Sequence, residues 1–298
     1  MLTIPARASI MVSMNRMDTA RRAAVIRCLI EGNSINSTVR MTGAAKNTVL
    51  KLLVEIGASC SAYMDRSMRN LTCERIQADE AWSFCYAKAK NVTEEIAREN
   101  EGAGDVWTWV AIDADTKLIP TWIVGNRDAH TARAFVKDLK SRLANRIQLT
   151  TDGLKFYFHA VSEYFDDEVD YAQLHKIYGG TVNEGGAGVR YSPAQCLGCE
   201  KKPKIGNPDE KHISTSFIER QNLTMRMSMR RFTRLNHVAS VALYMMYYNY
   251  GRKHTTLGTT PAVTAGITDH IWSVEEIVGV LEANEPKATR PARAASSN

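Results

Sequence analysis

The sequence predicts an α/β protein: a layered core around a mixed five-stranded sheet with flanking helices, preceded by a small all-α module. Two patterns support this. Strand-like apolar runs alternate with helical periodicity over residues 74–252, whereas residues 17–58 show helical patterns alone. The chain has 298 residues, of which 44% are hydrophobic and 23% charged, so it is long and apolar enough to bury a sizeable core.

Residues 17–58 resemble three short helices separated by turn residues. Asp18 or Thr19 can cap the first helix, which stops at Gly32, and the others cover 34–41 and 44–56. Helix, glycine-containing turn, helix is typical of a helix-turn-helix, whose last helix enters the DNA major groove. A helical bundle used only for packing is the alternative. Four exposed side chains at the start of the last helix suit phosphates and base edges: Lys46, Asn47, Thr48 and Lys51.

A polar linker, predicted to be helical, covers 59–73, and the core follows it. We expect strands at 75–86, 106–113, 118–125, 147–151 and 169–174. We expect helices at 128–143, 155–165, 214–231 and 235–250, although the alternation in 225–231 also permits a strand there. Residues 88–104 should form an exposed excursion, and the Gly-, Pro- and Lys-rich stretch 178–213 a long irregular insertion.

The two ends of the chain look different from the core. Residues 1–16 resemble a disordered leader without the apolar segment of a signal peptide, and 253–298 form a C-terminal extension with a disordered tail from about 284. No run of eighteen apolar residues occurs, so we expect no membrane span and a cytoplasmic protein.

Basic residues are concentrated in two blocks. Residues 1–57 carry eight Lys or Arg against three acids, and residues 201–234 carry nine against three. The formal net charge of the chain is +6. Two such blocks around a more acidic middle favour a polyanionic partner, of which DNA is the obvious one.

Three acids are candidates for a metal site. Asp79 lies in the first strand of the core, Asp152 at the carboxyl end of the fourth, and Glu219 on a later helix. The carboxyl ends of strands in open α/β sheets are where ligands bind. Three carboxylates from such places could together hold two Mg²⁺ ions about 3.5–4 Å apart, with Mn²⁺ able to substitute, for phosphodiester displacement.

The helix of Glu219 offers more polar groups at helical spacing. Glu219, Asn222 and Arg226 are spaced i, i+3, i+7, which places them on one face. Arg226 on this face, together with Arg230 and Arg231 in the same basic block, is expected to contact DNA.

Three segments resemble the catalytic blocks of transposases of the insertion-sequence-one family: ADEAWSF (78–84), TTDGLKFY (150–157) and FIERQNLTMRMSMRR (217–231). The last is the most specific, and the likeness spans roughly 76–249. It implies an RNase H-like fold, with which the order of elements above agrees. It also implies a DDE triad of Asp79, Asp152 and Glu219, supported by Asn222 and Arg226.

This chain departs from the best-known relative in three ways. It has no N-terminal zinc ribbon with paired cysteines, it carries the insertion at 178–213, and it continues into HTTLGTTPA (254–262) and DHIWSVEEI (269–277). These two C-terminal segments resemble a tail of integrase-like relatives.

The resemblance implies an enzyme that binds the terminal inverted repeats of its element as a homo-oligomer, cuts the 3′ ends and joins them to target DNA. Two alternatives are weighed against it. A stand-alone RNase H-like nuclease would have no end-binding module, and an inactivated transposase acting as a DNA-binding regulator would have a broken triad.

Some other residues are expected to be structural. Asp113 lies in the hairpin turn DADT, where it should shape the turn rather than bind metal. His130, His159, His175 and His212 have no metal-ligand spacing, so we expect structural or surface roles. Cys196 and Cys199 form a lone CxxC without a second ligand pair, which favours reduced thiols in a loop over a zinc site.

Overall fold

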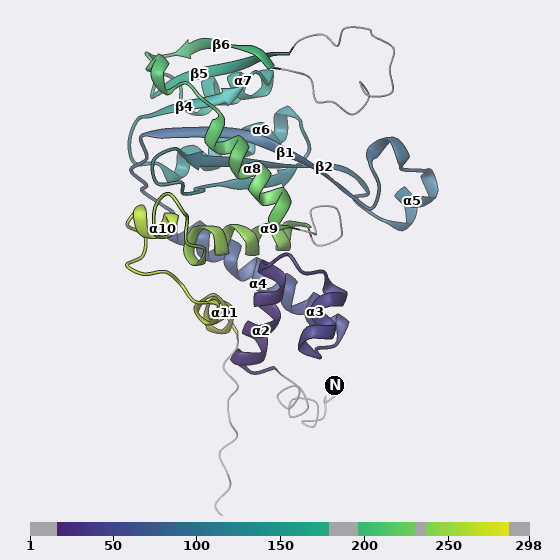
Figure 1. Ribbon diagram of the computed structural model, residues 1–298. Helices are drawn as coiled ribbons and strands as arrows, with labels where there is room; N and C mark the ends of the chain where they lie inside the picture. Colours follow the sequence, from purple (N-terminus) through teal and green to yellow (C-terminus); the bar gives the residue numbers. More distant parts are fainter. Residues whose placement is uncertain (1–16, 179–195, 230–236, 286–298) are drawn as a thin grey trace, which may run out of the picture.

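The computed structural model describes residues 17–178, 196–229 and 237–285 (Figure 1). The expected leader, almost all of the expected tail, and Arg230 and Arg231 lie outside these ranges, as does part of the expected insertion.

A six-stranded mixed sheet organises the core. Its strands are β1 (Arg75–Cys85), β2 (Gly104–Asp113), β3 (Trp122–Gly125), β4 (Ile147–Asp152), β5 (Val169–Tyr178) and β6 (Cys196–Ile205). The spatial order is β3-β2-β1-β4-β5-β6. Strands β1, β2 and β3 pair antiparallel, β4 and β5 join β1 in parallel, and β6 is antiparallel to β5. Three antiparallel strands followed by two parallel strands, each after a helix, is the order predicted for an RNase H-like core.

The sixth strand corrects the prediction of five strands and an irregular insertion. Strand β5 continues to Tyr178, and residues 196–205 return beside it as β6. Most side chains of β6 are exposed, as suits the edge of a sheet, and its lysines and Pro203 are typical of edge strands. Because neither face of β6 is deeply buried, its sequence carries no apolar alternation from which a strand could be predicted.

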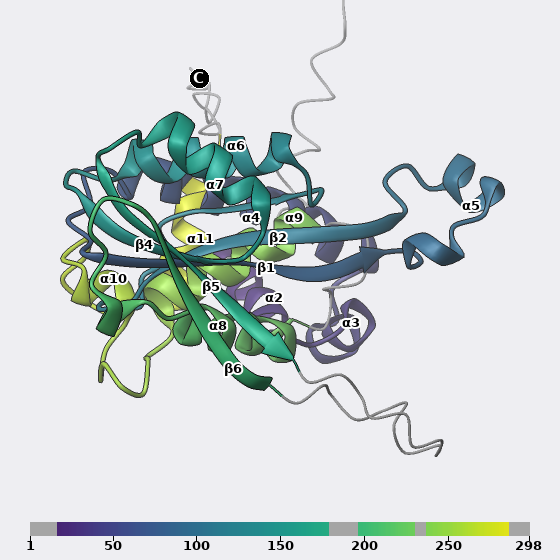
Figure 2. The same ribbon diagram turned by 90° about the horizontal axis from the view of Figure 1, so that it is seen from above.

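Helices cover both faces of the sheet. Helices α6 (Ala129–Arg142) and α7 (Lys155–Tyr164) lie on one face and α8 (Ser216–Ser228) on the other (Figure 2). Beneath α6 and α7 the buried rings of Trp109, Phe135 and Tyr157 contact one another. Because α8 continues to Ser228, the alternative strand is excluded over 225–228.

The N-terminal helices are α2 (Thr19–Ile30), α3 (Ile35–Thr42) and α4 (Lys46–Ser67). The first two match the prediction, with Asp18 and Ser34 accepting hydrogen bonds as N-caps. The third is longer than expected, since α4 runs without a break across the predicted boundary at 58 and into the predicted linker. Gly57 does not end it: a Cβ there would lie 2.6 Å from the Cα of Ala239, so glycine allows two helices to cross closely.

The C-terminal segments pack on this helical layer. After α8 come α9 (His237–Met246), a π-helical turn η4 (Tyr247–Gly251), α10 (Pro261–Thr264) and α11 (Val274–Ala283). Helix α9 packs along α4, and α11 packs against α2 and α4 (Figure 1). The predicted module and C-terminal extension therefore share one apolar core with the sheet.

The excursion predicted at 88–104 is an exposed arm. Strands β1 and β2 continue past the sheet and carry η1 (Ala89–Asn91) and α5 (Glu94–Glu99) at the tip (Figures 1 and 2). A single helical turn, η3 (Glu210–His212), precedes α8. Across the described ranges, no helix is both long and apolar enough to cross a membrane.

Candidate metal centre and active site

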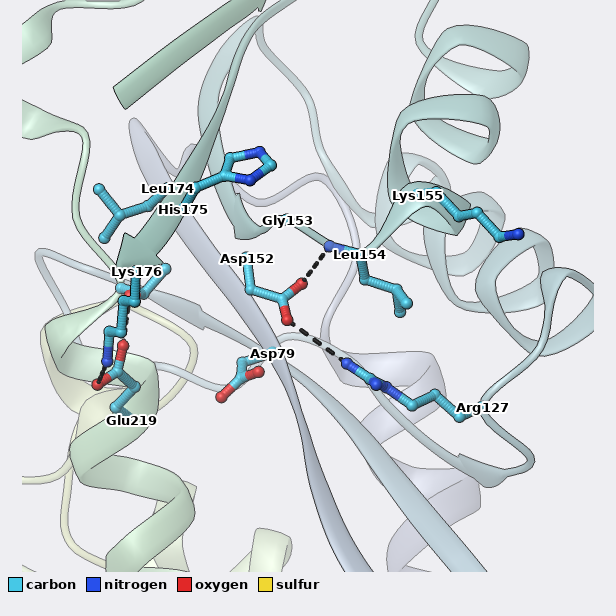
Figure 3. A pocket seen from close by; sticks show the side chains of 11 residues that line it. Asp79, Arg127, Asp152, Gly153, Leu154, Lys155, Leu174, His175, Lys176 and Glu219 are labelled. Atoms are coloured by element: carbon cyan, nitrogen blue, oxygen red, sulfur yellow. Dashed lines mark hydrogen bonds and ion pairs between the residues drawn. The ribbon is translucent and has the colours of Figure 1, made fainter. Parts of the chain in front are cut away.

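The structure brings Asp79 and Asp152 together on neighbouring parallel strands. In the β1–β4 register Ala78 lies opposite Thr151, so the two aspartates follow a paired position. Figure 3 shows their carboxylates facing each other. Ligand oxygens of Asp79, Glu80 and Asp152 all lie within 4.8 Å of one another. Two of the three predicted acids are therefore close enough to share a cation.

Two amide side chains dock α8 onto β1. The Oε1 atom of Gln77 accepts hydrogen bonds from the backbone N–H groups of Phe217 (2.9 Å) and Ile218 (3.2 Å) in the first turn of α8. One turn later, Nδ2 of Asn222 donates to Oδ2 of Asp79 at 3.0 Å. Residues 77 and 79 lie on the same face of the strand, and α8 is held against that face.

Glu219 lines the same cavity but lies outside the close cluster of acids. Its two carboxylate oxygens contact the ammonium group of Lys176, on β5, and the hydroxyl of Thr215 (Figure 3). Its negative charge nevertheless contributes to raising the pKa of Asp79. The third predicted acid thus faces the site across the cavity and is paired with a lysine that sequence reasoning did not single out.

Glu80 is a further site residue that sequence reasoning did not single out. Its side chain is 1% exposed and points to the α6–α7 face of the sheet, opposite to Asp79. Arg127 donates from Nε to Glu80 at 3.0 Å and lies 3.6 Å from Oδ2 of Asp152 through Nη2. The guanidinium also stacks over the Trp107 ring, 4.8 Å from its centroid. The only sequence signal for this group was the acidic pair at 79 and 80.

Negative charge at the centre is incompletely balanced. Burial and the nearby Asp152 raise the pKa of Asp79 to about 6 and that of Glu80 to about 7. The pKa of the buried Tyr157 hydroxyl is raised by burial and by Glu80, so this group stays neutral and does not balance the negative charge. A cation placed among these oxygens would remove the repulsion.

The donor set fits a hard divalent ion. All candidate ligands are carboxylate oxygens, the chemistry that Mg²⁺ and Mn²⁺ prefer, and the close group has no sulfur or imidazole member. Asp79 and Asp152 would hold such an ion, with Glu80 and Glu219 on either side. The excess negative charge is the observation that supports this fit.

The cavity around the acids is open and has a cationic rim. It has a volume of about 710 Å³. It is lined by Asp79, Arg127, Asp152, Gly153, Leu154, Lys155, Leu174, His175, Lys176, Thr215 and Glu219. Three of these carry a positive charge around a negative centre, an arrangement suited to a phosphodiester that bridges metal and protein.

The loop after Asp152 is shaped by its neighbours. Oδ1 of Asp152 accepts from the backbone N–H of Leu154 at 3.0 Å, which fixes the carboxylate. A Cβ on Gly153 would come within 2.7 Å of the His175 ring, so glycine is required for that ring to pack there. His175 therefore lines the candidate site, a position that the scattered spacing of the histidines did not reveal.

The expected DNA-contacting residues are accessible where they are described. Lys46, Asn47, Thr48 and Lys51 are exposed on the first turns of α4, after a turn in which Gly43 has φ +67°. Lys51 lies 3.8 Å from Glu55. Arg226 is exposed one turn beyond Asn222 on α8.

Unlike His175, Asp113 and the two cysteines of the CxxC do not line the cavity that holds the acids. Asp113 is buried and accepts hydrogen bonds from the N–H groups of Asp115 (3.4 Å) and Thr116 (3.1 Å), which closes the turn as predicted. Cys196 and Cys199 are exposed free thiols, but they lie on β6 rather than in the predicted loop. Residue 199 pairs in register with Lys176.

Comparisons with known proteins add little beyond this geometry. No protein-family model matches the sequence, and no curated protein matches it. Among solved structures, a chain of the simian T-cell lymphotropic virus intasome in complex with PP2A regulatory subunit B56 gamma aligns with a TM-score of 0.37 at 14% identity, covering 88% of this chain and 74% of that one. The piggyBac transposase synaptic complex with hairpin DNA aligns with a TM-score of 0.36 at 7% identity, covering 95% and 78%. Both TM-scores are below 0.5, so neither likeness indicates a function for this chain.

Proposed function

We propose that this protein is a DNA transposase of the insertion-sequence-one type. It binds the terminal inverted repeats of its element, cuts the 3′ ends in a Mg²⁺-dependent reaction and transfers them to target DNA. The observation that carries the proposal is the placement of Asp79 and Asp152 side by side on adjacent parallel strands, with Glu219 across the same open cavity.

The carboxylates form an anionic centre, which would repel a phosphodiester unless a cation is bound there. Bound Mg²⁺ would activate the attacking oxygen and stabilise the leaving oxygen of a phosphodiester. Asp79 and Asp152 hold the position, and Asn222 keeps the Asp79 carboxylate oriented toward it. Arg127 forms ion pairs with both Asp152 and the buried Glu80, so it also fixes the position of the Asp152 carboxylate.

The cationic rim engages the substrate. Lys155 and Arg127 can contact phosphate oxygens entering the cavity. Lys176 would contact a phosphate of the bound strand, and Glu219, its partner in the structure, would be a further ligand for the ion. Cleavage and joining use the same groups because each step displaces one oxygen from phosphorus by another.

End recognition is assigned to the helix-turn-helix of α2, α3 and the start of α4. The exposed residues Lys46, Asn47, Thr48 and Lys51 precede Gly57, where α4 crosses α9, so their side chains are accessible to a DNA groove. We place the protein on DNA as a homo-oligomer, since two element ends must be cut and joined together.

The test uses duplex DNA carrying the terminal repeats that flank the reading frame. The purified protein is incubated with and without Mg²⁺, beside the Asp152→Asn variant. We expect Mg²⁺-dependent nicking at the 3′ end and joined products with the parent protein, and intact DNA with the variant. Mn²⁺ should replace Mg²⁺.

The same assay separates the alternatives. Nicking at unrelated sequences without joined products would indicate a stand-alone nuclease. Specific binding to the repeats without nicking in either metal would indicate a DNA-binding regulator. Either result contradicts the proposal.

A further inference from the structure

A second cavity, whose lining has cations but no acids, lies on the other flank of α8. Its volume is about 460 Å³. It is lined by Ile112, Lys117, Phe217, Arg220, Gln221, Thr224, Tyr248, Arg252, Lys253, His254, Thr255 and Thr256. The lining residues come from α8, from the end of β2 and the turn after it, and from η4 and the segment that follows it.

Helix α8 separates the two cavities. Glu219 and Asn222 face the acidic centre, whereas Phe217, Arg220 and Thr224 face the second cavity, and each set repeats at helical spacing. An α-helix with its side chains is about 10–12 Å across. The basic cavity therefore lies roughly one helix diameter from the carboxylates.

The positive charge here lacks an internal counterion. No carboxylate is present among the described residues that line the cavity. Arg220, Arg252 and Lys253 are exposed, and Arg252 donates to the Ser228 hydroxyl at 3.2 Å. Over the ranges that the structure describes, neither Arg220 nor Lys253 forms an ion pair with an acid.

Two further groups at the floor of the cavity are held in place. The ammonium of Lys117 donates to the carbonyl of Ala114 and lies 3.4 Å from the centroid of the Phe217 ring. Beside it, Nδ1 of His254 is buried and has no hydrogen-bond partner among the described residues. Burial, and then the nearby charges of Lys117 and Arg252, lower the pKa of His254.

We propose that this cavity binds backbone phosphates of the DNA whose strand lies in the acidic centre. The proposal rests on the proposed function. Guanidinium, ammonium and threonine hydroxyl groups are donors that contact phosphate oxygens without reading sequence. The cations span three chain segments, a spread that suits successive phosphates along a strand better than one small anion. The cavity thus positions the DNA around α8, while the metal site on the opposite flank reacts with it.

The experiment measures DNA binding in the absence of divalent metal as a function of salt. The probe is a fluorescein-labelled duplex of about 30 base pairs carrying one terminal repeat. Each phosphate contact contributes about 0.9 to the slope of log affinity against log salt. The Arg220→Ala/Lys253→Ala variant should lower the slope by about 2, and the charge-preserving Arg220→Lys/Lys253→Arg variant should leave it near the parent value.

The matched control also removes two exposed cations, at the arm tip and on α6. Arg98 is 80% exposed and Lys137 is exposed, and neither lines this cavity. The Arg98→Ala/Lys137→Ala variant should keep the parent slope. An unchanged slope in the cavity variant, or an equal loss in the control, would overturn the proposal.

Two further measurements distinguish a backbone site from a small-anion site and from a failure of the proposed function. If millimolar inorganic phosphate displaces no DNA, the result supports a backbone site. If phosphate saturates His254, as seen by NMR, and the cavity variant keeps the salt slope of the parent for DNA, the cavity is a small-anion site and the proposal is refuted. Cleavage with Mg²⁺ is measured alongside. If the parent protein cuts DNA and the cavity variant keeps the salt slope of the parent, only the proposal for the cavity is refuted. If the parent protein binds DNA through the cavity but never cuts it, only the proposed function is refuted.

Discussion

Replacing Asp79 by asparagine should stabilise the metal-free protein while abolishing the proposed DNA cleavage. Burial and Asp152 raise the pKa of Asp79 from 3.8 to about 6. A difference of this size corresponds to about 3 kcal/mol at about 1.4 kcal/mol per pH unit. Asparagine carries no charge, and its Oδ1 can still accept the hydrogen bond that Asn222 donates at 3.0 Å. The variant should therefore gain up to about 3 kcal/mol in free energy of unfolding at pH 8.

The gain should depend on pH in a defined direction. The native carboxyl binds a proton more tightly than the unfolded one, so the native state of the parent becomes less stable as pH rises from about 4 to above 6. The advantage of Asp79→Asn is then full at pH 8, falls to about 1.5 kcal/mol at pH 5 and vanishes below the unfolded pKa. Urea unfolding in the presence of a chelator, at pH 8 and pH 5, measures both values.

A matched variant should behave in the opposite way. The Arg146 guanidinium, 2.8 Å from Asp170, lowers the pKa of that carboxyl, so Asp170→Asn should lose stability at pH 8. Added Mg²⁺ should raise the melting temperature of the parent at pH 8 but not that of Asp79→Asn, because the variant lacks one of the proposed metal ligands. If Asp79→Asn is less stable than the parent at pH 8, or still cuts DNA, the acids are not an anionic metal site.

The remaining predictions test the other parts of the site. Glu219→Gln should reduce Mg²⁺-dependent cleavage by orders of magnitude in a gel assay while leaving repeat binding unchanged; equal cleavage would remove Glu219 from the site. Gly153→Ala should cost about 1–3 kcal/mol in unfolding free energy and slow cleavage, because the new Cβ would lie 2.7 Å from the His175 ring; an unchanged melting curve would contradict this packing. Lys46→Ala/Lys51→Ala should weaken binding to the repeats and lower its salt slope by about 2, measured by anisotropy; an intact footprint with parent affinity would place end recognition elsewhere.

Local patterns in the sequence carried most of the secondary structure. Strands β1, β2 and β4 are buried over most of their length, and helices α6 and α7 each bury one face, so apolar runs and helical periodicity predict them to within a few residues. The same patterns fail where burial is shallow or a signal has two meanings. The exposed β6 was predicted as irregular, and Gly57, a residue that often ends helices, instead permits α4 to cross α9.

The carboxylates of the candidate site were proposed from the sequence, whereas their partners were not. Asp152 was singled out by its place at the carboxyl end of a strand, and the choice of Asp79 and Glu219 depended mainly on the resemblance of their segments to transposase blocks. Glu80, Arg127 and Lys176 could not be singled out in this way, since each acts through a residue far away in the chain.

The sequence by itself therefore determined the order of elements, which follows from local periodicity and composition, and indicated the acids that lie on them mainly through the resemblance of their segments to transposase blocks. Only the tertiary structure decided three other features: the proximity of Asp79 to Asp152, the pairing of Glu219 with Lys176, and the separation of an acidic and a basic cavity by α8. These depend on strand register and on the rotation of α8 against β1, which Gln77 and Asn222 set through hydrogen bonds spanning more than 130 positions of the chain. No local pattern in the sequence records such a contact.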